Sequence, residues 1–192
     1  MNNKLLETIK IVDGEALHLD YHQQRLENSL QALHVKAQIN LKEHLFAPKN
    51  GTYRCRVIYY ESVLKVEYFP YTFSAINSLK LIQCDSIDYP LKYENREKLN
   101  ALFELKGECD DILIVKNSLL SDTSKANLAF FDGSKWFTPS LPLLYGTTRA
   151  RLLDEKKIFE KTLHVSDLSS FSKVAVLNAL VDFCVLKDGI IT

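Results

Sequence analysis

Long apolar stretches are absent from this chain of 192 residues. No segment approaches the ~20 consecutive apolar residues of a membrane-spanning helix, and the first residues include no apolar core of a secretory signal. Basic and acidic residues number 24 each, so the formal net charge is zero. This balance gives no reason to expect a nucleic acid or a membrane as a partner.

Close cysteine pairs and metal-ligand spacings are absent as well. The four cysteines lie far apart and form no Cys-x-x-Cys motif; they are Cys55, Cys84, Cys109 and Cys184. Unpaired thiols of this kind suit a reducing compartment, so we expect a cytoplasmic protein. The five histidines show no ligand spacing, and the sequence therefore predicts no metal site.

The order of predicted elements favours an α/β (α+β) fold in two parts. In the first part, residues 5–12 form a strand, Asp13-Gly14 is a hairpin turn, and residues 16–19 return as a second strand. Asp20 is the expected cap of a helix over residues 21–33. A short helix and two strands follow, at residues 41–46, 52–60 and 63–71. This pattern predicts a small α/β domain over residues 1–74.

The remaining residues, 75–192, are rich in strand patterns and contain two helical ones. Strands are predicted at 79–84, 111–116, 128–131 and 135–137, helices at 94–106 and 148–157, and short apolar elements at 173–177 and 182–186. We therefore expect a larger β-rich domain after the first one.

Three segments in chain order offer an amine, a carboxylate and a Gly-Thr-Thr turn that opens a helix. Lys92 can form a Schiff base with an aldehyde, and Asp122 can keep a ring nitrogen protonated. The N–H groups of a helix that begins after Gly146 can bind a phosphate. An aldehyde, a ring nitrogen and a phosphate occur together in pyridoxal 5′-phosphate (PLP).

The local sequences resemble those of class IV aminotransferases, the fold-type IV PLP enzymes. Four segments carry the resemblance: His22–Ser29 (His-x-x-Arg-Leu-x-x-Ser), Lys92–Arg96 (Lys-x-x-Asn-Arg), Ser121–Leu128 and Gly146–Arg149 (Gly-Thr-Thr-Arg). The resemblance implies a small N-terminal α/β domain, a larger β-rich domain with PLP between the two, and a homodimer that acts on a small amino-acid-type substrate.

The resemblance also implies a role for each site residue. Lys92 would bind PLP and then serve as a proton shuttle. Asp122, where the family usually has glutamate, would hold the ring nitrogen. The phosphate would be bound by Arg25 and by the turn, which is Gly146, Thr147 and Thr148.

Each of these residues also has a simpler interpretation. A lysine such as Lys92 is most often a solvated surface charge, and Asp122 lies in a sequence typical of turns. The Gly-Thr-Thr turn could simply cap a helix, and Arg25 could lie on a solvated helix face. Arg149, at the end of the turn, could be a surface residue.

Two further residues are candidates for substrate binding. Arg54 and Arg56 alternate on a predicted strand and so share one face, where an anion would relieve their repulsion. Arg56 fits the substrate-carboxylate position of the family better. Asn178 lies in an Asn-Ala-Leu sequence that resembles the active-site wall of 4-amino-4-deoxychorismate lyases.

The resemblance favours a 4-amino-4-deoxychorismate lyase, which releases pyruvate and 4-aminobenzoate for folate synthesis. The alternatives are a branched-chain or D-amino-acid aminotransferase and a non-catalytic binding protein of the same fold. Larger members of the family have an extra stretch before the strand that corresponds to Leu6-Glu7-Thr8. Because that stretch shapes the pocket and the dimer contact, its absence here leaves the substrate more open than the cofactor.

Overall fold

The computed structural model describes residues 4–187 and 189–191. The chain forms two compact units: residues 1–73 with Leu91–Asn95, and residues 74–90 with 96–192. The chain therefore leaves the second unit briefly at Leu91 and returns to it after Asn95. A single division after residue 74 stays a prediction about independent domains. Among the described residues, no helix is long and apolar enough to cross a membrane.

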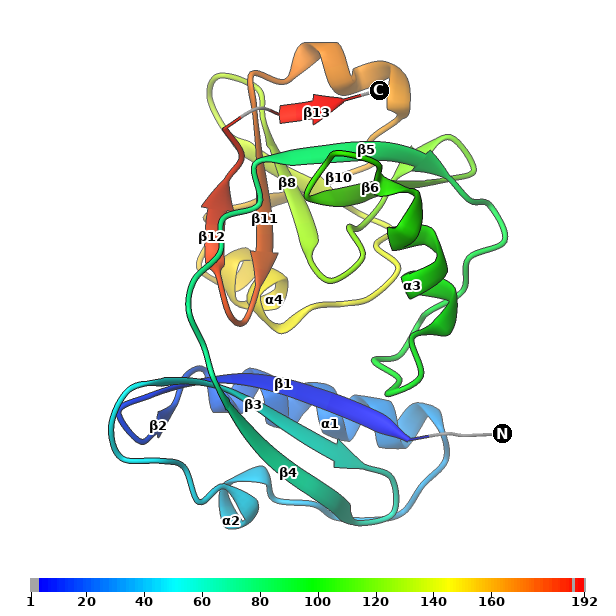
Figure 1. Cartoon of the computed structure of the whole chain (residues 1–192). Coiled ribbons are helices and arrows are strands. Elements are labelled where there is room, and N and C mark those ends of the chain that lie inside the picture. Colours follow the sequence, from blue (N-terminus) through cyan, green and yellow to red (C-terminus); the bar gives the residue numbers. More distant parts are fainter. Residues whose placement is uncertain (1–3, 188, 192) are drawn as a thin grey trace. The chain divides into compact units, whose positions relative to one another are not determined.

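The first unit is a four-stranded sheet with a helix on one face (Figure 1). The strand order is β2-β1-β3-β4, and all neighbouring strands are antiparallel. The strands and helices are β1 (Leu5–Val12), β2 (Glu15–Ala16), α1 (Leu19–Ala32), α2 (Leu41–His44), β3 (Thr52–Tyr59) and β4 (Val63–Pro70). The predicted order of strands and helices is thus present, and the short strand β2 corresponds to the predicted return strand.

The beginning of the first unit differs from the prediction in two details. The hairpin at Asp13-Gly14 is confirmed, with both residues at positive φ, but the return strand β2 ends at Ala16. The helix α1 then begins at Leu19, and its N-cap is His18 instead of Asp20. His18 adopts a left-handed conformation that turns the chain early, and Asp20 lies in the first helical turn, where a negative charge favours the helix dipole.

Alternating side chains of β1 hold α1 against the sheet. Leu5, Ile9 and Ile11 are fully buried and pack in one cluster with Leu26 and Leu30 of α1. The strand period of two places these three residues on one face, and the helix period places Leu26 and Leu30 on one side of α1.

The segment that carries Lys92 joins the free side of β1. The Leu6 N–H donates to the Lys92 carbonyl at 2.8 Å, and the Glu94 N–H donates to the Lys4 carbonyl at 2.9 Å. Tyr93 also forms an isolated β-bridge with Leu5. Strand-like pairing therefore fixes the backbone on both sides of Lys92.

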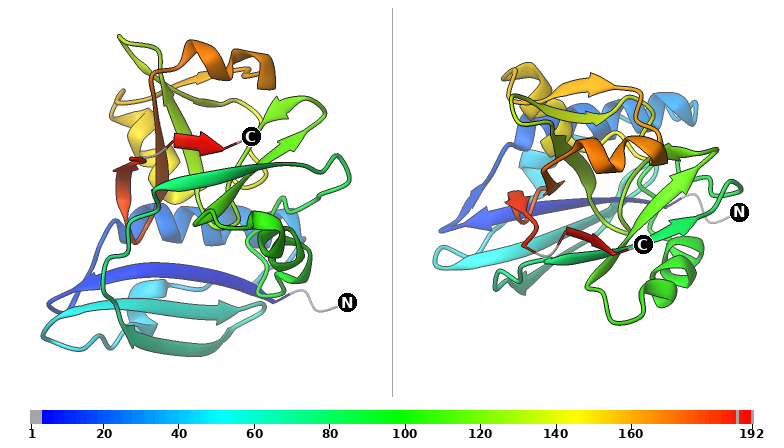
Figure 2. Two further views of the ribbon diagram at one scale, coloured as in Figure 1. Left: turned by 45° about the horizontal axis from the view of Figure 1, so that its top comes forward. Right: turned by 90° about the horizontal axis from the view of Figure 1, so that it is seen from above.

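The second unit packs two sheets face to face (Figure 2). One sheet has the order β10-β9-β8-β11-β12 and the other β13-β5-β6-β7. Its strands are β5 (Ser78–Gln83), β6 (Asp111–Lys116), β7 (Leu119–Leu120), β8 (Asn127–Phe131), β9 (Trp136–Pro139), β10 (Phe159–Lys161), β11 (Lys173–Asn178), β12 (Asp182–Val185) and β13 (Gly189–Ile191). Its helices are α3 (Glu97–Phe103), η1 (Glu104–Lys106), α4 (Thr147–Asp154) and η2 (Val165–Ser170).

The alternation of β8 explains the layers of this unit. Leu128 and Phe130 point into the core cluster that also contains Leu113 of β6, whereas Ala129 packs with Leu152 of α4. The helix α4 therefore covers the outer face of the larger sheet. Strand β6 has the predicted bounds, but β7, β10 and β13 were not predicted, since strands of two or three residues are too short to show an alternating pattern.

A buried charge cluster ties α1 to β1. Glu7, fully buried, accepts hydrogen bonds from Arg25 Nε at 2.9 Å and Arg25 Nη2 at 2.5 Å. His22 Nδ1 lies 2.6 Å from the same carboxylate. Burial by itself would raise the pKa of Glu7, but Arg25 and His22 outweigh it and hold the pKa at about 2. Glu7 is therefore a structural anion of the first unit.

We predict that Glu7→Gln destabilises the protein by about 3 kcal/mol at pH 7, because Arg25 loses its buried anion. The lowered pKa means that this stabilisation is full above the unfolded-state value of 4.5 and is lost as the pH falls toward about 2. Urea unfolding should therefore show that the gap between wild type and variant narrows between pH 5 and pH 3. The exposed Glu15→Gln is the matched control, and an equal gap at both pH values would contradict a charge effect.

Candidate functional site

Lys92 lies near the buried charge cluster of the first unit. After burial and the Arg25 charge, the Lys92 ammonium also contributes to lowering the pKa of His22, while the hydrogen bond that His22 donates to Glu7 opposes the shift. The first unit thus brings together Lys92 and Arg25, two residues that the sequence assigned to one site. The half-buried Lys92 is held by its backbone on the edge of β1.

Arg25 is not on a solvated helix face. Its side chain is 13% exposed, and two of its nitrogens donate to Glu7. Ser29 Oγ in turn donates to the Arg25 carbonyl at 2.7 Å. This pairing orients the guanidinium, and its contact with a phosphate stays a prediction.

Asp122 is a buried carboxylate held by neutral donors. Its side chain accepts a hydrogen bond from Asn127 Nδ2 at 2.8 Å and one from the Leu144 N–H at 2.9 Å. Burial raises the pKa of Asp122 to about 6, although these two donors and the Arg149 charge act in the opposite direction. A carboxylate in this environment gains stability from any cationic group that comes within hydrogen-bond distance.

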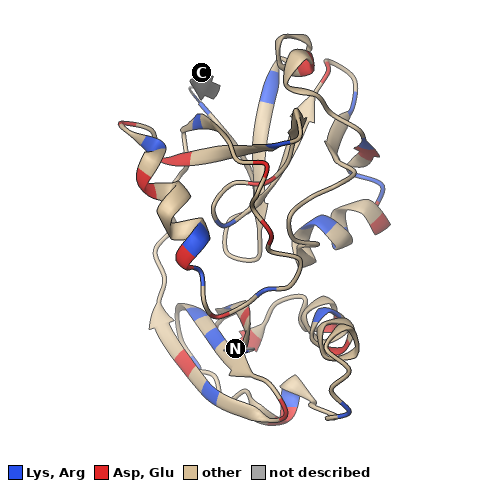
Figure 3. Ribbon diagram, turned by 90° about the vertical axis from the view of Figure 1, so that its right-hand side faces the viewer, with Lys and Arg blue, Asp and Glu red and all other residues tan. Residues whose placement is uncertain are grey.

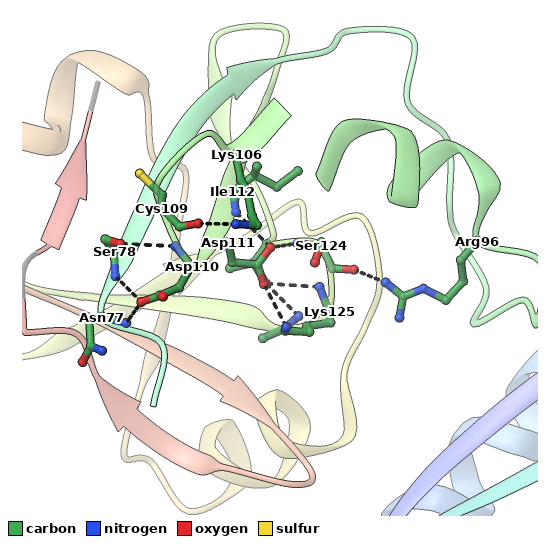
Figure 4. Close-up of polar contacts among 12 residues, drawn as sticks. Asn77, Ser78, Arg96, Lys106, Cys109, Asp110, Asp111, Ile112, Ser124 and Lys125 are labelled. Atoms are coloured by element: carbon green, nitrogen blue, oxygen red, sulfur yellow. Dashed lines mark hydrogen bonds and ion pairs between the residues drawn. The ribbon is translucent and has the colours of Figure 1, made fainter. Parts of the chain in front are cut away.

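The loop that carries Asp122 is fixed on several sides. The Ile114 N–H donates to the Asp122 carbonyl at 2.9 Å, which attaches the loop to β6. At the next turn, the Ser124 N–H donates to the buried Asp111 carboxylate at 3.3 Å. Arg96 Nη2 donates to the Ser124 carbonyl at 2.6 Å from the opposite side (Figure 4). The position of Asp122 is thus set by contacts from β6 and from the residue before α3.

The Gly-Thr-Thr turn opens α4, as the sequence predicted. Gly146 is the N-cap, and the first intrahelical hydrogen bond runs from the Ala150 N–H to the Gly146 carbonyl at 3.0 Å. The N–H groups of Thr147, Thr148 and Arg149 precede that bond and can receive an anion. Both threonines are buried, so this helix end is shielded within its own unit.

Gly146 also faces a neighbour that excludes any side chain. A Cβ atom at this position would lie 2.0 Å from Asn127 Oδ1. Packing against Asn127 therefore requires a glycine at this position. Asn127 lies in the segment Ser121–Leu128 that carries the family resemblance, but the sequence does not identify its partners.

Arg149 is a buried residue and not the surface residue that the sequence suggested. It is 3% exposed, and its Nη2 donates to the Pro139 carbonyl at 2.9 Å and to Glu160 Oε1 at 2.6 Å. These bonds attach the first turn of α4 to β9 and β10. Since β10 was not predicted, the sequence offered no partner for this arginine.

The two substrate candidates have local partners. Arg56 lies 3.4 Å from Glu67 on the neighbouring strand, and Arg54 stacks over Phe69, so both arginines are accommodated without an added anion. Asn178 Oδ1 accepts the N–H groups of Leu180 and Val181 at 2.9 and 3.0 Å, which closes the turn between β11 and β12. Substrate contacts of Arg56 and Asn178 stay predictions.

Charges elsewhere are mixed along the ribbons of both units (Figure 3). Among residues 4–187 and 189–191, no three His, Cys, Asp or Glu side chains are placed to hold a metal ion. The most distinctive chemistry of the second unit is therefore Asp122 together with the N-terminus of α4. A buried carboxylate and such a helix end can serve a ligand that has a cationic ring nitrogen and a phosphate.

We predict that Asp122→Asn changes the pH dependence of stability in the protein without ligand. A pKa raised from 3.8 to about 6 means that the fold favours the protonated carboxyl, so stability is full below 3.8 and is lost as the pH rises through 6. Between pH 4 and pH 7 the stability of the variant relative to wild type should rise by about 2 kcal/mol. Thermal unfolding measures the change, with the exposed Asp88→Asn as control; a gap that stays constant with pH would contradict it.

Comparison with known proteins shows the family of this chain. Residues 92–185 match the family described as amino-transferase class IV. An uncharacterized protein of Haemophilus influenzae is 37% identical over 182 residues, which cover 92% of this chain and 97% of the relative.

Solved structures share the fold. A protein of Haemophilus somnus, provisionally described as a 4-amino-4-deoxychorismate lyase, is 36% identical with a TM-score of 0.85, over 93% of this chain and 97% of that chain. The branched-chain amino acid aminotransferase of Escherichia coli has a TM-score of 0.79 at 14% identity, over 98% of this chain and 77% of that one. The predicted mixed α/β fold is confirmed, and the chain belongs to the class IV aminotransferase family.

Proposed function

We propose that this protein is a PLP-dependent enzyme and that it cleaves 4-amino-4-deoxychorismate into 4-aminobenzoate and pyruvate. Membership of the class IV aminotransferase family supports the reaction class, and the relative from Haemophilus somnus supports the lyase. An aminotransferase of Brucella abortus with this fold, 16% identical, is bound to PLP. The observation that carries the proposal is Asp122, buried beside the N-terminus of α4.

The residues of the chain fit the cofactor. PLP has a ring nitrogen that is cationic when protonated, and Asp122 is a buried carboxylate whose hydrogen bonds come from two neutral donors, the Asn127 amide and the Leu144 N–H. PLP also has a phosphate, and the N–H groups at the start of α4 match it. Lys92 supplies the amine, and its backbone is fixed by β1.

Each residue then has a defined task. Lys92 would hold the cofactor through its aldehyde carbon, and its Nζ amine would be the base for the proton on the substrate carbon that bears the amine. Asp122 would keep the ring nitrogen protonated, and Thr147, Thr148 and Arg25 would hold the phosphate. When bound, PLP withdraws electrons from that substrate carbon. Loss of pyruvate makes the substrate ring aromatic, which drives the cleavage.

Substrate recognition is proposed for two residues, each of which has a polar group that its local contacts do not fully use. The Arg56 side chain is 30% exposed and pairs with Glu67 at a long 3.4 Å, so a substrate carboxylate could compete for its guanidinium. Asn178 uses its carbonyl oxygen in the turn, which leaves the amide nitrogen for a contact. We further propose a cytoplasmic homodimer, as the family resemblance implies.

An aminotransferase for branched-chain or D-amino acids is the second candidate, because the fold is shared with the Escherichia coli branched-chain enzyme. The same lysine and carboxylate would serve it in two half-reactions. The reactions differ in their needs: a lyase requires no keto-acid acceptor, and an aminotransferase does. A non-catalytic protein of this fold would not require Lys92 to react.

We predict that the purified protein with PLP has a visible absorption band that Lys92→Ala lacks, because only the lysine amine can bind the aldehyde covalently. Borohydride reduction followed by peptide mass analysis should place the cofactor on Lys92. The exposed Lys98→Ala is the matched control and should retain the band. A wild-type protein without the band would contradict the enzyme proposal.

Product analysis tests the reaction itself. With 4-amino-4-deoxychorismate and no keto acid, we expect the wild type to release 4-aminobenzoate and pyruvate in equal amounts, and Lys92→Ala to release neither. Amino-group transfer from a branched-chain or D-amino acid to a keto acid, without 4-aminobenzoate formation, would favour the aminotransferase instead.

A further inference from the structure

A closed ring of hydrogen bonds joins three points of the second unit. Asn127 Nδ2 donates both to Asp122 Oδ1 and to the Leu144 carbonyl, each at 2.8 Å. The Leu144 N–H donates to the other oxygen of Asp122 at 2.9 Å. One carboxamide therefore links the carboxylate loop to the chain that leads into α4.

The same side chain also contacts the helix end. Asn127 Oδ1 points at Gly146, so closely that a Cβ atom there would be 2.0 Å away. Asn127 is the first residue of β8, where it pairs with Leu177 of β11, and only 5% of it is exposed. Its backbone is anchored in the sheet, and its amide thus sets the distance between Asp122 and the N-cap of α4.

We propose that Asn127 is a positioning residue that presets the span between the ring-nitrogen carboxylate and the phosphate-binding helix end. This inference rests on the proposed binding of PLP. A ligand that contacts both Asp122 and the N-terminus of α4 binds more tightly when their separation is fixed, because neither has to be ordered on binding. A ligand that reaches only the helix end gains nothing from it.

A second consequence concerns Gly146. Residue 146 must lack a side chain because the Asn127 amide occupies the place where a Cβ atom would lie. An added methyl group at residue 146 should therefore act by displacing Asn127. Truncation of Asn127 should remove the clash that a side chain at residue 146 would cause. The effects of the two substitutions on ligand binding should therefore be strongly non-additive.

Two probes separate these effects. Pyridoxine 5′-phosphate has the ring nitrogen and the phosphate but no aldehyde, so its binding does not need Lys92 to react, and inorganic phosphate reaches the helix end alone. We expect Asn127→Ala and Asn127→Ser to weaken pyridoxine 5′-phosphate at least about tenfold, because a hydrogen bond to a charged group is lost, and to change phosphate binding less than about twofold. Calorimetry gives both dissociation constants.

Gly146→Ala should weaken pyridoxine 5′-phosphate in the wild-type background but add less than about twofold in the Asn127→Ala background. The exposed Asn100→Ala is the control for both probes, and cooperative thermal unfolding confirms that each variant is folded. Equal weakening of the two probes by Asn127→Ala, or an equal effect of Gly146→Ala in both backgrounds, would overturn the inference. A wild type that binds neither PLP nor pyridoxine 5′-phosphate would instead overturn the proposed function and the inference with it.

Discussion

The burial of the Asp122 carboxylate is the constraint on which the second unit depends. A charged group removed from water needs donors, and here the donors are the Asn127 amide and a backbone N–H of the segment before α4. Meeting that need ties together the carboxylate loop, the start of β8 and the approach to α4. The arrangement that satisfies the carboxylate is therefore also the one that places a helix N-terminus beside it.

Glu7 and Asp122 show two solutions to the same problem. Glu7 has a cation, Arg25, on both of its oxygens, and its pKa falls to about 2. Asp122 has neutral donors, and its pKa rises to about 6. The first carboxylate is fully compensated within the fold and acts as structure. The second is compensated only in part, which is the state expected of a group that completes its interactions with a ligand.

Two arginines of the second unit have structural roles like that of Glu7. Arg96 and Arg149 both donate to backbone carbonyls, those of Ser124 and Pro139, and so fix the loop and the helix end from outside. Neither bond depends on a ligand. The second unit thus holds its candidate cofactor contacts on a loop fixed from several sides and on a helix N-terminus, and positioning a reactive ring requires such rigidity.

The sequence predicted those elements that depend on interactions between residues close together in the chain. The Asp13-Gly14 hairpin, β6 and the helix after Gly146 depend on local turn chemistry and on alternating side chains, and the sequence predicted all three. The short strands β7 and β10 have too few residues to show an alternating pattern. They form because they pair with the neighbouring strands β6 and β9. The left-handed His18 was equally invisible, so the start of α1 was displaced by two residues.

By itself, the sequence determined the family, the candidate site residues and their order along the chain, because these are properties of residue type and local spacing. Only the tertiary structure decided which partners complete them. Arg25 meets Glu7 across 18 positions, Asn127 meets Leu144 across 17, and Arg149 meets Glu160 across 11. Pairings at such separations result from how strands and helices pack, and no local pattern in the chain records them.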